Sequence, residues 1–116
     1  MATNRPCFIG LTVRNYNECV RFYRDALGIP LKHGEDYEHY ECSWHKPYMH
    51  FAIFPAPSDQ AGLSFWVDDL EEAHKRAVKT GVSVLHAPRD FPWGRTAEYL
   101  DPEGNRVSLV QGLTRT

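Results

Sequence analysis

The stretch FPWGRTAEYLDPEGNRVSLVQ, residues 91–111, decides the fold because it contains two strand-like runs joined by a fixed turn. The turn is residues 101–105, DPEGN. Its proline presets φ at the second position, and its glycine can take the left-handed conformation that closes a hairpin. The flanking runs, residues 96–100 and 106–110, hold the β-branched and apolar residues of strands. The sequence therefore predicts a β-hairpin here.

Two earlier segments share one pattern: a short apolar strand, a capped helix and a glycine. They are residues 8–28, FIGLTVRNYNECVRFYRDALG, and residues 62–81, GLSFWVDDLEEAHKRAVKTG. Aligning Val13 with Val67 gives an offset of 54 residues (67 minus 13). Each segment then shows the spacing of a capping box, in which an Asn or Asp caps the helix and a Glu lies three residues later. These residues are Asn15 with Glu18 and Asp69 with Glu72.

Short strands follow each predicted helix, and prolines such as Pro88 mark their ends. The order is therefore βαβββ, twice. We expect one domain over residues 1–116, with modules at about 6–54 and 62–112 and a linker at 55–61. Such a duplication predicts an α+β fold whose sheets close around a cleft. The alternative is a ferredoxin-like sandwich without a cleft. The predicted strands after the helices are 31–33, 37–44, 48–54, 82–87, 95–100 and 106–110.

The hairpin, preceded by Pro92-Trp93-Gly94-Arg95, resembles the end of proteins in the glyoxalase/bleomycin-resistance/dioxygenase superfamily, also called vicinal oxygen chelate proteins. The resemblance covers nearly the whole chain, and it implies the same paired βαβββ order, the glyoxalase-like fold. Its motif recurs across that superfamily, so it identifies the fold better than the ligand.

Enzymes of that superfamily hold one divalent metal ion, so the resemblance also maps metal-ligand positions onto this chain. They fall on Phe8, on Gly62, near Ala52 and on Ser108. None is a good ligand, because oxygen and imidazole groups are what such a metal requires. No HxH or HExxH spacing exists either. We therefore expect no metal ligands and no cofactor. A displaced divalent metal site, using His50 and Glu98, is the lesser alternative.

Strand alternation assigns side chains to one face of each strand. The rows that carry polar or aromatic residues predict a cleft wall suited to an organic ligand. The alternative is that these rows face solvent or a dimer partner, and His50 is then a half-buried strand histidine. Trp93 and Trp66 would stack on planar ligand rings. The predicted ligand-binding residues are Phe8, His50, Ser64, Trp66, Trp93, Glu98 and Ser108.

These observations favour a metal-free small-molecule binding protein. The resemblance implies that an antibiotic is among the expected ligands, because metal-free members of that superfamily sequester bleomycin-like drugs. A net charge of −2 is mild for binding a strongly cationic drug. The second hypothesis is an enzyme: a lyase, isomerase or dioxygenase with a displaced metal site, or a metal-free reaction with Glu98 and His50 as acid and base. The third is a domain that only associates with other chains.

Composition narrows the cellular context. Lys and Arg are scattered and the net charge is −2, so neither nucleic acid nor an anionic membrane is an expected partner. The apolar runs are too short to span a bilayer, and no signal peptide is recognisable. Three cysteines without a CxxC spacing predict reduced thiols in the cytoplasm. Small paired modules benefit from sharing core, which predicts a homodimer.

Overall fold

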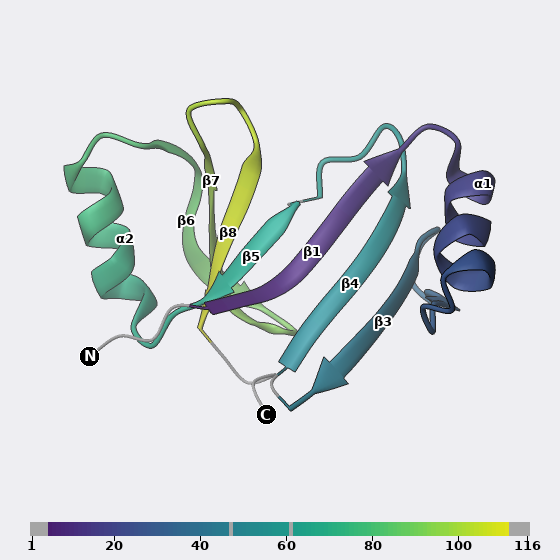
Figure 1. Ribbon diagram of the computed structural model, residues 1–116. Coiled ribbons are helices and arrows are strands. Elements are labelled where there is room, and N and C mark those ends of the chain that lie inside the picture. The colour runs from purple at the N-terminus through teal and green to yellow at the C-terminus, as the bar shows by residue number, and fades with distance from the viewer. Residues whose placement is uncertain (1–4, 47, 61, 112–116) are drawn as a thin grey trace.

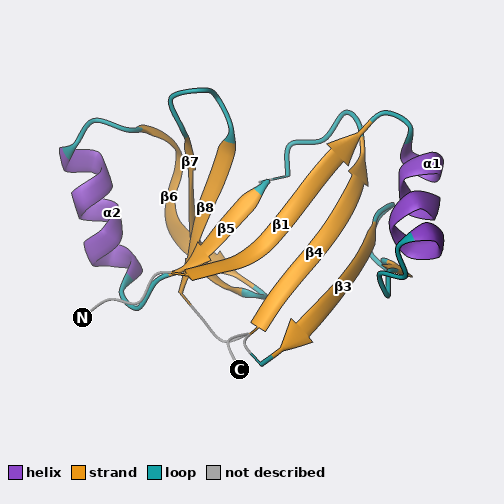
Figure 2. Cartoon of the chain, in the orientation of Figure 1, coloured by secondary structure: helices purple, strands orange, loops and turns teal. Residues whose placement is uncertain are grey.

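The computed structural model describes residues 5–46, 48–60 and 62–111. Eight strands form one continuous sheet in the order β2-β3-β4-β1-β5-β8-β7-β6, and two helical segments lie at its opposite ends (Figures 1 and 2). The predicted α+β class is confirmed. The elements are β1 (Arg5–Val13), α1 (Tyr16–Arg21), η1 (Phe22–Ala26), β2 (Lys32–His33), β3 (Tyr40–His45), β4 (Tyr48–Pro55), β5 (Leu63–Trp66), α2 (Leu70–Lys79), β6 (Ser83–Phe91), β7 (Gly94–Leu100) and β8 (Arg106–Gln111).

The two halves have the same strand layout. In each half the first and last strands pair in parallel, β1 with β4 and β5 with β8, and the remaining strands add outward in antiparallel pairs. The first strands, β1 and β5, pair antiparallel at the centre of the sheet. This pairing joins the sheets of the two halves edge to edge.

Each half has a core beneath its own helix. Val20, Leu31 and Ile53 form the buried cluster beneath α1, and Val67, Leu70 and Ala97 belong to the one beneath α2. Burial of these apolar side chains is the main source of stability. Within the described residues, neither helix is long and apolar enough to cross a membrane.

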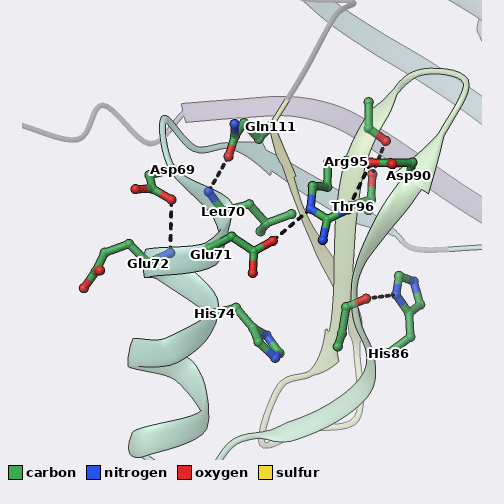
Figure 3. Close-up of polar contacts among 12 residues, drawn as sticks. Asp69, Leu70, Glu71, Glu72, His74, His86, Asp90, Arg95, Thr96 and Gln111 are labelled. Atoms are coloured by element: carbon green, nitrogen blue, oxygen red, sulfur yellow. Dashed lines mark hydrogen bonds and ion pairs between the residues drawn. The ribbon is translucent and has the colours of Figure 1, made fainter.

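The predicted cap of α2 is present. The Asp69 carboxylate accepts the backbone N–H of Glu72 at 3.1 Å, and Gln111 Oε1 of β8 accepts the N–H of Leu70 at 2.6 Å (Figure 3). The predicted cap at Asn15 is wrong, because its side chain makes no capping hydrogen bond. The reason lies in the backbone: Asp69 is extended, with φ −137° and ψ 98°, whereas Asn15 has φ −90° and ψ 67°.

The first helix ends in a wider turn than the second. Residues Phe22–Ala26 form a π-helical turn, and the N–H of Leu27 donates to the carbonyl of Phe22, five residues earlier, at 3.0 Å. Gly28 follows with φ +76°, the left-handed conformation expected at a helix end. Gly28 lies 12 residues after Tyr16, where the first helix begins (28 minus 16), and Gly81 lies 11 residues after Leu70, where the second begins (81 minus 70). The first half therefore has one more residue between helix start and glycine.

The predicted final hairpin is also present. The Asp101 carboxylate accepts the backbone N–H groups of Glu103 and Asn105, both at 2.9 Å, and Gly104 has φ +86°. The side-chain amide of Asn105 also donates to this carboxylate, at 3.0 Å, and it lowers the pKa of Asp101 most, with the backbone N–H groups adding to the effect. The turn fixes the register of β7 against β8 and therefore places Glu98 opposite Ser108.

The predicted end of the 82–87 strand at Pro88 is wrong. Strand β6 continues to Phe91, because it is the edge strand of the sheet and an edge tolerates a residue without a backbone N–H. The pairing with β7 also shifts register between His86 and Arg89, on either side of this proline. In the first half, β3 begins at Tyr40 rather than residue 37.

Replacing Leu70 with alanine tests the second core. Leu70 is fully buried, so Leu70→Ala should lower the free energy of unfolding by about 2–5 kcal/mol through lost burial and the cavity left behind. Val78→Ala on the same helix removes an exposed side chain and should change it by less than about 0.5 kcal/mol. Urea unfolding followed by circular dichroism measures both, and equal losses would contradict the placement of this core.

Candidate functional site

One row of residues crosses seven neighbouring strands in register. In-register neighbours in a sheet point to the same face, so these side chains share one surface. Polar and aromatic groups dominate the row, as the strand patterns predict. From β3 to β6 the row is Ser43, His50, Phe8, Ser64, Ser108, Glu98 and His86.

A cleft of about 1090 Å³ lies over this row. This is large enough for a drug-sized organic molecule. All seven residues that the sequence nominates lie on its wall, and their contact with a ligand stays a prediction. They are Phe8, His50, Ser64, Trp66, Trp93, Glu98 and Ser108.

The seven residues differ in how accessible they are. Trp66 is only 2% exposed and packs with Cys7 and Val110, so it forms the floor of the cleft. Ser64 and Ser108 are also buried, and their hydroxyl groups are hydrogen bonded to each other. The predicted stacking role therefore suits Trp93, which is 49% exposed, better than Trp66.

Stacked rings line the cleft on both sides. Phe8 stacks on His50 with ring centroids 5.6 Å apart, and Tyr48 is nearly parallel to His50 at 6.5 Å. In the second half Phe91 stacks on Trp93 at 4.7 Å. The indole N–H of Trp93 donates to Thr96 Oγ1 at 3.0 Å, which fixes the orientation of that ring.

Glu41 links two histidines on the first-half wall. Its Oε1 lies 3.0 Å from His50 Nε2 and 3.1 Å from His39 Nε2. The other ring nitrogen of His50, Nδ1, is 2.8 Å from the hydroxyl oxygen of Ser43. Burial lowers the pKa of His50, and the Glu41 carboxylate opposes this without reversing it. His50 is therefore a neutral base near neutral pH, with both nitrogens hydrogen bonded.

Glu98 is already paired within the chain. Its Oε1 accepts a hydrogen bond from the Arg106 guanidinium at 2.9 Å. In the register row Phe8, Ser64 and Ser108 lie between Glu98 and His50. The structure thus places both candidate acid–base residues in one cleft but does not bring them into contact.

The residues at the mapped metal positions do not fit a metal ion. Gly62 has no side chain. Its backbone carbonyl accepts the N–H of Gly10, and its backbone N–H donates to the carbonyl of Arg106. Phe8, Ala52 and Ser108 line the cleft without offering a carboxylate or imidazole. Both nitrogens of His50 are engaged. Across residues 5–46, 48–60 and 62–111, no three His, Cys, Asp or Glu side chains are grouped to hold a metal.

Several wall residues were missed by the sequence argument. Glu41 and Ser43 alternate on β3, so the same face rule that selected His50 was available for them. Cys7 also lines the cleft, next to Phe8. Its position follows from a register shift between Pro6 and Phe8, which strand alternation does not reveal.

Comparisons with known proteins support the same fold. A family model described as Glyoxalase/Bleomycin resistance protein/Dioxygenase superfamily matches residues 7–109. The anthracycline biosynthesis protein DnrV of Streptomyces peucetius is 45% identical over 47 residues, which are 40% of this chain and only 17% of that protein. The chain therefore matches about a sixth of that relative's length.

Two solved structures show a similar fold. The 2,3-dioxygenase LapB from Pseudomonas sp. KL28 has a TM-score of 0.69 at 20% identity, covering 97% of this chain and 41% of that one. Methylmalonyl-CoA epimerase from Mycobacterium tuberculosis has a TM-score of 0.65 at 18% identity, covering 93% and 87%. At these identities the likeness concerns the fold alone.

The titration of two histidines, His50 and His33, should change the stability of the folded protein with pH in opposite directions. The folded pKa of His50 is lowered, so its contribution to stability is present above the unfolded pKa of about 6.5 and is lost as the pH falls below it. The hydrogen bond to Glu38 raises the pKa of His33, so its contribution is present at low pH and lost as the pH rises.

We therefore expect His50→Gln to flatten the rise in stability between pH 5.5 and 7.5, and His33→Gln to steepen it. Urea unfolding at several pH values measures these slopes. An unchanged slope in His50→Gln would show that His50 does not resist protonation in the folded protein.

Proposed function

We propose that this chain, which belongs to the glyoxalase/bleomycin resistance protein/dioxygenase superfamily, binds a small organic molecule in its cleft without a metal ion. One observation carries the proposal: a cleft of about 1090 Å³ is lined by aromatic rings, and the mapped metal positions on its wall, Phe8, Ala52 and Ser108, offer no carboxylate or imidazole. Apolar walls with a few oriented polar groups are typical of sites for small organic ligands.

Planar aromatic compounds are the ligand class that the wall favours. The Phe91–Trp93 pair and the rings around His50 offer flat surfaces for stacking. The 47-residue similarity to a protein of anthracycline biosynthesis supports a planar polycyclic ligand, such as an antibiotic of that kind. Arg106 neutralises Glu98, so that carboxylate does not by itself demand a cationic ligand.

We further propose a homodimer in the cytoplasm. Cys7, Cys19 and Cys42 are free thiols, which supports a reducing compartment. Val84 and Leu85 of the edge strand β6 are exposed, which supports a partner on that side. Solution scattering at working concentration should give twice the mass of the chain, and a monomer mass would contradict the dimer.

Metal content separates binding from the metal-dependent alternative, a lyase, isomerase or dioxygenase. Untagged protein equilibrated with Mn, Fe, Co, Ni and Zn salts and then desalted should retain far less than one metal per chain. Elemental mass spectrometry measures this. Retention of about one metal per chain would overturn the metal-free proposal and make His50 and Glu98 the first ligands to mutate.

A tryptophan pair tests ligand stacking with doxorubicin, an anthracycline, as the probe. Trp93→Ala should raise the Kd about fivefold, the equivalent of ~1 kcal/mol of lost stacking. Trp44→Ala is the control, because Trp44 is similarly exposed but does not line the cleft. Fluorescence titration measures both. Equal Kd changes would contradict the stacking role, and no thermal shift with any of a panel of planar aromatics would contradict binding.

A further inference from the structure

We propose that Ser43, His50 and Glu41 act as nucleophile, general base and orienting group for acyl transfer, giving the cleft an esterase activity. This goes beyond the proposed binding function. All three side chains lie on the cleft wall. A hydroxyl, an imidazole and a carboxylate in hydrogen-bonded sequence are recognised by their geometry and can occur on unrelated folds.

The hydrogen-bond geometry fixes where the protons lie. His50 Nε2 is 3.0 Å from Glu41 Oε1, and a carboxylate only accepts, so Nε2 carries the proton. In the neutral imidazole Nδ1 is then the acceptor, and it receives the Ser43 hydroxyl at 2.8 Å. The serine proton therefore points at the base that would remove it.

The sheet holds this arrangement rigidly. Ser43 and His50 are directly paired across β3 and β4, and Glu41 lies two residues before Ser43 on the same face. Phe8 stacks on the imidazole ring, and buried His39 approaches the same Glu41 oxygen at 3.1 Å. Functional groups on strands are held more precisely than groups on loops.

Two further features suit the chemistry. Burial keeps His50 neutral against the opposing influence of Glu41, while His39 acts in the same direction as burial, so the base is available at neutral pH. The ring of Tyr48 lies nearly parallel to that of His50 on the same cleft wall, with the two centroids 6.5 Å apart. Its hydroxyl is the candidate donor to the negative charge that develops on a carbonyl oxygen during attack.

The reaction balances with an ester and water as reactants. Ser43 Oγ bonds to the ester carbonyl carbon while its proton passes to His50 Nδ1. The bond from carbon to the alcohol oxygen then breaks, and that oxygen takes the proton, leaving an acyl-serine. Water attacks this carbonyl and gives its proton to Nδ1. Ser43 leaves with that proton, and a carboxylic acid is released.

Covalent labelling tests the nucleophile directly. Full-length protein is treated with diisopropyl fluorophosphate and followed by intact mass and peptide mapping, with hydrolysis of p-nitrophenyl acetate measured in parallel. We expect one adduct on Ser43, none in Ser43→Ala, and an unchanged rate in Ser83→Ala, an exposed serine outside the cleft. His50→Gln should slow labelling by about 100-fold or more, the usual contribution of a general base.

The outcomes separate this inference from the binding proposal. Absence of an adduct on Ser43, or equal labelling rates in wild type and His50→Gln, overturns the acyl-transfer inference. Doxorubicin titration of the same samples reports binding independently. Binding without an adduct overturns the esterase activity alone, whereas an adduct with no aromatic ligand bound supports the activity and contradicts the proposed function. Thermal melts of each variant confirm that it is folded.

Discussion

The antiparallel pairing of β1 with β5 is the constraint on which the cleft depends. It places the first strands of both halves side by side, and each brings its parallel partner, β4 or β8, to its other side. The register of this single pairing aligns Phe8 with Ser64. A slip of one residue would turn the other face of β1 toward the cleft and present Ile9 in place of Phe8. The polar and aromatic row would then be broken at its centre.

The two halves share a layout but contribute different chemistry to the cleft. The first half supplies titratable groups that contact one another, with Glu41 between His39 and His50. The second half supplies the ion pair of Glu98 with Arg106 and the stacked aromatic pair of the β6–β7 hairpin. A molecule in the cleft would therefore meet hydrogen-bonded histidine and glutamate side chains on one side. On the other side it would meet a carboxylate neutralised by Arg106 and two stacked aromatic rings. The aromatic pair of the second half can be altered without changing the contacts of Glu41 with His39 and His50, because the two sets of side chains come from different segments of the chain.

The features that the sequence predicts correctly are those that residues close together in the chain determine. The final hairpin and the cap at Asp69 depend on residues close together in the chain, and both were predicted. The failures involve distant parts of the molecule or backbone geometry: the backbone at Asn15 does not support a cap, and β6 runs past Pro88 because it is an edge. The cleft face followed from alternation alone. The hydrogen bonds of His50 did not, because they depend on the register of β3 against β4.

The π-helical turn after α1 bears on where this fold tolerates insertions and deletions during evolution. The first half holds one more residue than the second between the start of its helix and the glycine that ends it, and the wider turn at Phe22–Ala26 absorbs that residue. The helices pack against the sheet on the face opposite the cleft row, as the burial of Leu70 and Ile53 indicates. An insertion or deletion can therefore accumulate in a helix without displacing any strand. Length variation among homologous chains should concentrate there, and alignments anchored on strands should be more reliable than alignments anchored on helices.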